Sequence, residues 1–183
     1  MVVPQALEVV VKEKLLNMRF YWFLALNLLF HAAYAQESLK DVLEKYNSND
    51  VPYVSIAELN TTSKSYILLD AREIEEFKVS HLKDAIHVGY NDFTMESVND
   101  QVPNKNSDII VYCSLGVRSE VIASKLIEAG YTNVKNLYGG IFEWKNQNHD
   151  VYNLRNQITD SVHAYSKTWS KWLNSGIKVF SKD

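Results

Sequence analysis

The stretch that decides the fold runs from residue 108 to residue 119 and reads Asp108-Ile109-Ile110-Val111-Tyr112-Cys113-Ser114-Leu115-Gly116-Val117-Arg118-Ser119. Its first part is largely apolar and rich in β-branched side chains, a composition that is typical of a buried strand. Residues 120–127 then repeat apolar side chains at helical spacing. A strand, a short loop and a helix therefore meet at Cys113, which is the single cysteine of the chain.

The loop between this strand and this helix favours a thiolate. Backbone N–H groups of the loop and of the first helical turn have no partner inside the helix, so they are available to an anion in the loop. Arg118 adds a positive charge beside the sulfur, and opposite charge and helix N-termini both lower the pKa of a thiol. We therefore predict a nucleophilic Cys113; the alternative is a buried cysteine that acts only as a small hydrophobic residue.

Two further motifs accompany the pattern Cys-x-x-Gly-x-Arg-Ser of residues 113–119. The first consists of Leu68-Leu69-Asp70-Ala71-Arg72-Glu73, then Glu76-Phe77 and residues 80–88, and the second is Asn136-Leu137-Tyr138-Gly139-Gly140-Ile141-Phe142-Glu143-Trp144. With these motifs in order, residues 50–150 resemble the rhodanese-like sulfurtransferases. The alternation of predicted strands and helices agrees with the fold that this resemblance implies, a single α/β domain with a mostly parallel central sheet and helices on both faces.

The resemblance and the loop chemistry together suggest roles for individual residues. Cys113 is the predicted catalytic nucleophile. The predicted substrate-binding residues are the rest of the loop, namely Ser114, Leu115, Gly116, Val117, Arg118 and Ser119. Arg118 has two candidate roles, to recruit an anionic donor and to hold the loop closed. The predicted structural supports are Asp70, Arg72, Gly139 and Gly140. Ser80 and Asp84 stand where many relatives carry glycine.

The resemblance implies transfer of a sulfane sulfur from thiosulfate or a persulfide to a thiol or cyanide, through a persulfide on Cys113. Two alternatives stay open. A phosphatase would also use cysteine and arginine in a loop, but the phosphatase relatives have one more residue between them than the four present here. The second alternative is a binding module that is non-catalytic or redox-sensing. No cofactor or metal is expected, since His149 and His163 show no metal-ligand spacing.

The helix predicted over 72–79 has an acidic side. We expect Ile74 and Phe77 to point inward, and Glu73, Glu75 and Glu76 to form a solvated face. His81 opens the next strand, and we expect it to be architectural rather than a general base.

The C-terminal part, 151–183, is predicted to be a helical extension. Its aromatic and aliphatic residues recur on one helical face, formed by Val162, Tyr165, Trp169, Trp172 and Leu173. We expect this face to dock on its own domain; the alternative is a protein partner.

Composition limits the partners. The chain has 183 residues, is 46% hydrophobic and 22% charged, and has a formal net charge of −3. Without a basic field it is not expected to bind nucleic acid. The expected partners are a small-molecule sulfur donor and a thiol acceptor.

The N-terminal residues resemble a secretory signal. Arg19 precedes an apolar run over 20–30, and Ala33-Tyr34-Ala35 has the form of a cleavage site. We expect 1–17 to be an upstream extension, 18–35 a signal peptide and 36–50 a helix with a linker ahead of the domain at 51–150. We then expect an exported, periplasmic protein with no membrane span after cleavage. The alternatives are that this segment is an uncleaved membrane anchor, or an amphipathic helix of a cytoplasmic protein.

Overall fold

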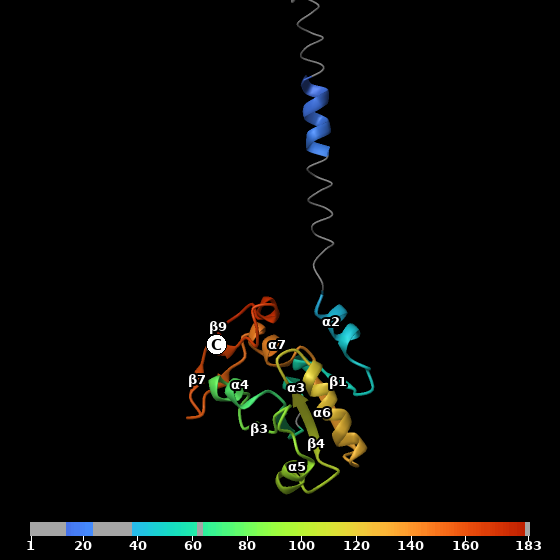
Figure 1. The fold of residues 1–183 in the computed structure, drawn as a ribbon, viewed down its shortest axis with the longest axis vertical. Helices are drawn as coiled ribbons and strands as arrows, with labels where there is room; N and C mark the ends of the chain where they lie inside the picture. Colours follow the sequence, from blue (N-terminus) through green and yellow to red (C-terminus); the bar gives the residue numbers. More distant parts are fainter. Residues whose placement is uncertain (1–13, 24–37, 62–63, 182–183) are drawn as a thin grey trace, which may run out of the picture. The chain divides into compact units, whose positions relative to one another are not determined.

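A computed structural model describes residues 14–23, 38–61 and 64–181 (Figure 1). The chain divides into two units, Met1–Ser38 and Leu39–Asp183. In the first unit, residues 14–23 form a helix, whereas 24–37, with most of the predicted signal peptide, lie outside the described residues. Within the described ranges, no helix is both long and apolar enough to cross a membrane.

The second unit is built on a five-stranded parallel sheet with the strand order β1-β5-β4-β2-β3. Its strands are β1 (Tyr53–Val54), β2 (Ile67–Asp70), β3 (Ile86–His87), β4 (Asp108–Tyr112) and β5 (Asn133–Leu137). Parallel neighbours need long crossover connections, and the helices between the strands provide them. The predicted fold class, a parallel α/β sheet, is confirmed.

Helices cover both faces of this sheet. They are α2 (Leu39–Tyr46), α3 (Ile56–Thr61), α4 (Ile74–Val79), α5 (Met95–Gln101), α6 (Val117–Glu128) and α7 (Gly140–Asn146). Ile109 and Val111 of β4 pack in one core with residues of α5 and α6. Ile110 and Tyr112 alternate to the opposite face and pack with residues of α3 and α7. The central strand is apolar throughout its middle because both of its faces are buried.

The C-terminal part is not the predicted helical extension, and that prediction is wrong. It contains an antiparallel pair, β6 (Val151–Tyr152) with β7 (Ile158–Thr159), and a parallel pair, β8 (Ser161–His163) with β9 (Ile177–Val179). As far as residue 181, where the described part ends, a helical turn is retained only in the 3-10 helix η1 (Trp169–Trp172). Left-handed backbone at Asn156, Tyr165 and Gly176 interrupts any continuous helix.

This segment belongs to the same unit as the sheet. Val162 and Leu173 are fully buried in the core that also holds Tyr112. β8 packs against α4. The expected docking of the apolar residues on their own domain is therefore observed, but through strands and one short turn.

The orientation predicted for α4 is wrong at Ile74 and Glu76, although Glu75 is exposed as expected. Glu76, expected in a solvated face, is 3% exposed, whereas Ile74, expected to point inward, is 41% exposed. The helix has only six residues, so a hydrophobic pattern fixes its rotation weakly. A cationic partner decides it instead, because a carboxylate can be buried only when it is paired.

Candidate active site

Cys113 lies directly after β4, in the turn that leads into α6. Gly116 is the N-cap of α6, with a left-handed φ of 118°, which glycine adopts without the cost that a Cβ would add. This turn directs the Gly116 N–H at the cysteine, with 3.1 Å between its nitrogen and Sγ. The backbone amide of Ser119, in the first turn of α6, also lowers the pKa of the thiol. The helix N-terminus thus supplies the amide donors that the sequence predicted.

The pKa of Cys113 lies below that of an ordinary thiol. Burial raises this pKa, since the side chain is only 2% exposed. The charge of Arg118 and the donors from Ser119 and Gly116 favour the anion and together outweigh burial. The site therefore stabilises a thiolate, which is the nucleophilic form of cysteine.

Arg118 does not project freely into the site. Its guanidinium makes two charge-assisted bonds to Glu76, with Nη1 to Oε2 at 2.6 Å and Nη2 to Oε1 at 2.9 Å. Ser114 completes the group: its hydroxyl donates to Glu76 at 3.1 Å and accepts from Arg118 at 3.1 Å. Burial raises the pKa of Glu76, but the bonds and charge of Arg118 outweigh it and hold that pKa below the usual value. We call Glu76, Ser114 and Arg118 the carboxylate cluster.

A second set of bonds ties the loop to β5. The Asn136 side chain donates to the Gly116 carbonyl at 2.7 Å and accepts from the Ser119 hydroxyl at 2.7 Å. The same hydroxyl oxygen lies 3.5 Å from the cysteine sulfur. Since this hydroxyl has one proton, it can serve Asn136 or Cys113 but not both at once.

Gly140 allows the backbone of α7 to approach the cysteine loop, whereas a Cβ on Gly139 would clash with the Glu143 side chain of the same helix. A Cβ on Gly140 would clash with the Cys113 carbonyl oxygen and lie 2.8 Å from the Ser114 carbonyl carbon. The close approach lets the first amides of α7 donate to the loop, from Ile141 to the Cys113 carbonyl at 2.9 Å and from Phe142 to the Ser114 carbonyl at 3.1 Å.

Asp70 and Arg72 form a fully buried ion pair, with Nη2 of the arginine 2.6 Å from Oδ2 of the aspartate. Arg72 also donates to the Ser80 carbonyl at 2.6 Å. These bonds connect the end of β2 to the end of α4. Asp84 stands where many relatives carry glycine. Its φ of 58° lies in the left-handed region, which aspartate tolerates better than most residues.

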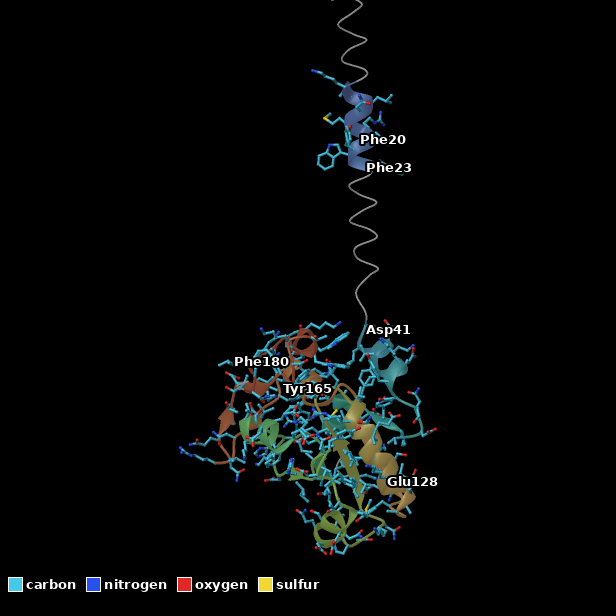
Figure 2. The ribbon with its side chains drawn as sticks, in the orientation of Figure 1. Phe20, Phe23, Asp41, Glu128, Tyr165 and Phe180 are labelled. Atoms are coloured by element: carbon cyan, nitrogen blue, oxygen red, sulfur yellow. The ribbon has the colours of Figure 1, made fainter. Side chains whose placement is uncertain are left out.

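The loop opens into a pocket of about 120 Å³. It is lined by Cys113, Ser114, Leu115, Val117, Arg118, Tyr165 and Trp169. Tyr165 and Trp169 come from the C-terminal segment, on which Figure 2 labels Tyr165. The Tyr165 ring lies over Arg118, with 4.6 Å from the guanidinium carbon to the ring centre. Each predicted loop residue except Gly116 and Ser119 therefore lines the pocket.

His163 of β8 is near two residues of the site, Glu76 and Tyr165, and is 5% exposed. Its Nδ1 accepts the backbone N–H of Tyr165 at 3.2 Å and lies 3.9 Å from Glu76. Burial lowers the pKa of His163, the two nearby arginines lower it further, and Glu76 opposes them. The neutral imidazole agrees with an Nδ1 that accepts a hydrogen bond, so we assign no ion pair with Glu76.

Sequence reasoning missed five residues around the sulfur: Glu76, Asn136, His163, Tyr165 and Trp169. A signal for Glu76 was present, since Arg118 in a largely apolar loop needs a carboxylate and the acidic run 73–76 supplies candidates. The apolar spacing of 162–173 marks Tyr165 and Trp169 as packing residues, but no local pattern places them at the pocket, because the chain brings them there from far along the sequence.

Fold and site together define a parallel α/β protein with a cysteine of lowered pKa at a strand-to-helix turn. Residues 54–147, more than half of the chain, match the family model described as the rhodanese-like domain. The chain belongs to the rhodanese-like domain family, as its three motifs predicted.

Curated relatives match this region. The chain is 31% identical over 106 residues to the adenylyltransferase and sulfurtransferase UBA4 of Candida albicans, covering 55% of this chain and 24% of that protein. It is 32% identical over 108 residues to the tRNA uridine(34) hydroxylase of Buchnera aphidicola, covering 56% of this chain and 35% of that protein. The chain spans between about a quarter and a half of the length of the curated relatives that it matches.

Two solved structures share the fold. The thiosulfate sulfurtransferase of Pseudomonas aeruginosa has a TM-score of 0.51 and 22% identity, over 67% of this chain and 23% of that chain. The rhodanese-like domain from an Anabaena protein has a TM-score of 0.50 and 20% identity, over 56% of this chain and 80% of that one.

Proposed function

We propose that the protein is a sulfurtransferase that carries a sulfane sulfur on Cys113. The observation that supports this most directly is the stabilised thiolate, which receives the Gly116 N–H at 3.1 Å and faces a pocket. Membership of the rhodanese-like family and a relative named as a sulfurtransferase agree with it.

The reaction would proceed in two exchanges. The Cys113 thiolate attacks the outer sulfur of the donor; a bond forms between the two sulfurs as the donor's bond to that sulfur breaks, and the electron pair leaves with the rest of the donor. With thiosulfate, the leaving group is sulfite. A thiolate or cyanide then attacks the outer sulfur of the Cys113 persulfide and returns the thiolate. The loop amides stabilise the persulfide anion, as an oxyanion hole stabilises oxygen.

The phosphatase alternative has less support. A phosphate dianion needs a wide loop and an arginine directed at its oxygens, but this loop has four residues between Cys113 and Arg118. Arg118 is committed to Glu76 by two short bonds. A redox-sensing module is the second candidate, favoured by the lowered pKa of Cys113, since oxidation follows thiolate character.

The deciding experiment compares wild type with Cys113→Ser. We expect thiocyanate from thiosulfate and cyanide with wild type, a persulfide adduct by intact mass, and neither with the variant. Equal turnover in both proteins would eliminate the enzyme proposal. Hydrolysis of phosphate esters without a persulfide would return the phosphatase, and reversible oxidation of Cys113 without turnover would support the sensor.

We also propose that the protein is exported, on the strength of Arg19, the apolar run 20–30 and the Ala33-Tyr34-Ala35 sequence. Intact-mass analysis of the protein from its native cells reports the N-terminus and the state of Cys113 together. A mature chain beginning at Gln36 is expected, and an intact N-terminal segment in the cytosolic fraction would contradict export.

A further inference from the structure

We propose that the donor for Cys113 carries an apolar organic group about the size of one ring, which Tyr165 and Trp169 bind, and that thiosulfate is a poor donor by comparison. This inference rests on the proposed sulfur transfer and names its donor class, a sulfane donor with an apolar substituent. Three features of the pocket support it: its charge, its lining and the way the aromatic residues are held.

The pocket has no uncompensated positive charge to attract a dianion. Among the seven lining residues in the described part of the chain, Arg118 is the only one with a positive charge. Its guanidinium is bound to Glu76, which is buried, so the pair is neutral as a unit. A thiolate at Cys113 then leaves the site with a negative charge, which repels thiosulfate more than it repels a donor of lower charge.

The lining beyond the sulfur is largely apolar. Leu115, Val117, Tyr165 and Trp169 provide aliphatic and aromatic surface beside Cys113. The volume of about 120 Å³ compares with an engineered cavity of about 150 Å³ that takes up benzene. Thiosulfate has no group to occupy this surface, whereas a small ring or short alkyl chain would displace water from it.

The two aromatic residues are held in place by contacts outside the pocket. Tyr165 has a φ of 62°, a region that a bulky side chain adopts only when its surroundings enforce it. His163 accepts its backbone N–H, and Arg118 lies under its ring. Trp169 packs against Tyr46 of α2, with 5.8 Å between ring centres. Such fixed rings bind an apolar group at low cost in entropy.

Thiosulfonates provide matched donors. Thiosulfate, methanethiosulfonate and benzenethiosulfonate deliver the same outer sulfur, and the S–S bond that breaks leaves sulfite, methanesulfinate or benzenesulfinate respectively. The measured quantity is kcat/KM for each donor with cyanide as acceptor. Each value is divided by the donor's rate with free cysteine, which removes differences in intrinsic reactivity.

For wild type, we expect the normalised kcat/KM to rise from thiosulfate through the methyl to the phenyl donor. In Trp169→Ala, the ratio of the phenyl donor to thiosulfate should fall by about three- to tenfold, the effect of one aromatic contact. Trp172→Ala is the matched control, because Trp172 lies in the same turn, is also half-buried and does not line the pocket. Its ratio should stay that of wild type.

The possible outcomes separate the two proposals. A flat wild-type series, or equal ratios in wild type and Trp169→Ala, would overturn the donor class while sulfur transfer stands. If the ratio of the phenyl donor to thiosulfate falls equally in Trp172→Ala, the donor class is also overturned, because a residue outside the pocket would have the same effect. If no donor forms a persulfide on wild-type protein, the proposed function itself fails. The wild-type series needs no variant, so it decides the matter even if Trp169→Ala does not fold.

Discussion

Cys113 is subject to opposing effects. Burial favours the neutral thiol, whereas Arg118 and the donors from Ser119 and Gly116 favour the thiolate and prevail. The left-handed backbone at Gly116 directs these donors at the sulfur before any charge is present. The site is therefore preorganised, because no group needs to move when the negative charge develops. The lowered pKa of this residue is therefore a property of its loop.

This balance predicts the pH dependence of alkylation. Because the pKa of Cys113 is lowered, its reaction with iodoacetamide should reach half its maximal rate at a lower pH than the same cysteine in the denatured chain, which titrates near about 8.5. The measurement is the rate of mass gain at each pH, with and without denaturant. If the midpoint pH of alkylation in the folded protein is at or above that in the denatured chain, burial outweighs the donors. Cys113 would then not be a nucleophile of lowered pKa.

At the scale of elements, the site depends on how closely α7 approaches the cysteine loop. Gly140 permits the approach, and the amides of Ile141 and Phe142 then bind the carbonyls of Cys113 and Ser114. Those bonds orient the peptide groups on either side of the sulfur. A side chain at residue 140 would push α7 away from the loop.

Gly140→Ala should therefore destabilise the protein and impair sulfur transfer. Its φ of 54° is costly for alanine, and the added Cβ would meet backbone atoms that cannot rotate away. We expect a loss of about 2–4 kcal/mol in the free energy of unfolding, measured by urea denaturation. Gly130→Ala is the control, since its φ is 92° but nothing lies within 4 Å of the added Cβ. If the two variants lose the same stability, close approach is not what Gly140 provides.

Local patterns predicted the elements that carry the motifs, and they failed where tertiary contacts decide. The strand over 133–137 and the helix after Cys113 are found where their apolar patterns placed them. The rotation of α4 was predicted wrongly because Glu76 is buried by an ion pair to a residue 42 positions away. The aromatic spacing of 162–173 is compatible with a helix, but pairing of β8 with β9 overrides it.

At the scale of the whole molecule, Glu76 links three separate parts of the second unit. It extends from α4, binds the cysteine loop through Arg118 and Ser114, and lies 3.9 Å from His163 of β8. The Tyr165 ring covers the same arginine from the C-terminal segment. One carboxylate thus holds the arginine that connects the cysteine loop to the Tyr165 ring.

Glu76→Gln should accordingly lower the free energy of unfolding far more than a substitution of an exposed residue does. Removing the carboxylate from a buried pair leaves Arg118 uncompensated, and we expect a loss of about 3 kcal/mol in the free energy of unfolding at pH 7. Glu75→Gln is the matched control on the same helix; its ion pair with Lys78 is exposed, and such pairs contribute about 0–1 kcal/mol. Equal stability of the two variants would show that the carboxylate cluster does not hold the parts together.

The stability that Glu76 provides should also depend on pH in a defined direction. Burial raises the pKa of this carboxyl, but the bonds and charge of Arg118 lower it more, so the folded-state pKa lies below the unfolded value of about 4.3. The ionised group then stabilises the fold fully at pH values above the unfolded pKa, and this contribution disappears as the pH falls through the folded-state pKa. The difference in unfolding free energy between wild type and Glu76→Gln, measured by urea denaturation, should therefore be constant from pH 6 to pH 7 and shrink progressively below about pH 4. A difference that stays constant into acid would mean that the shape of the side chain, and not its charge, is what the cluster requires.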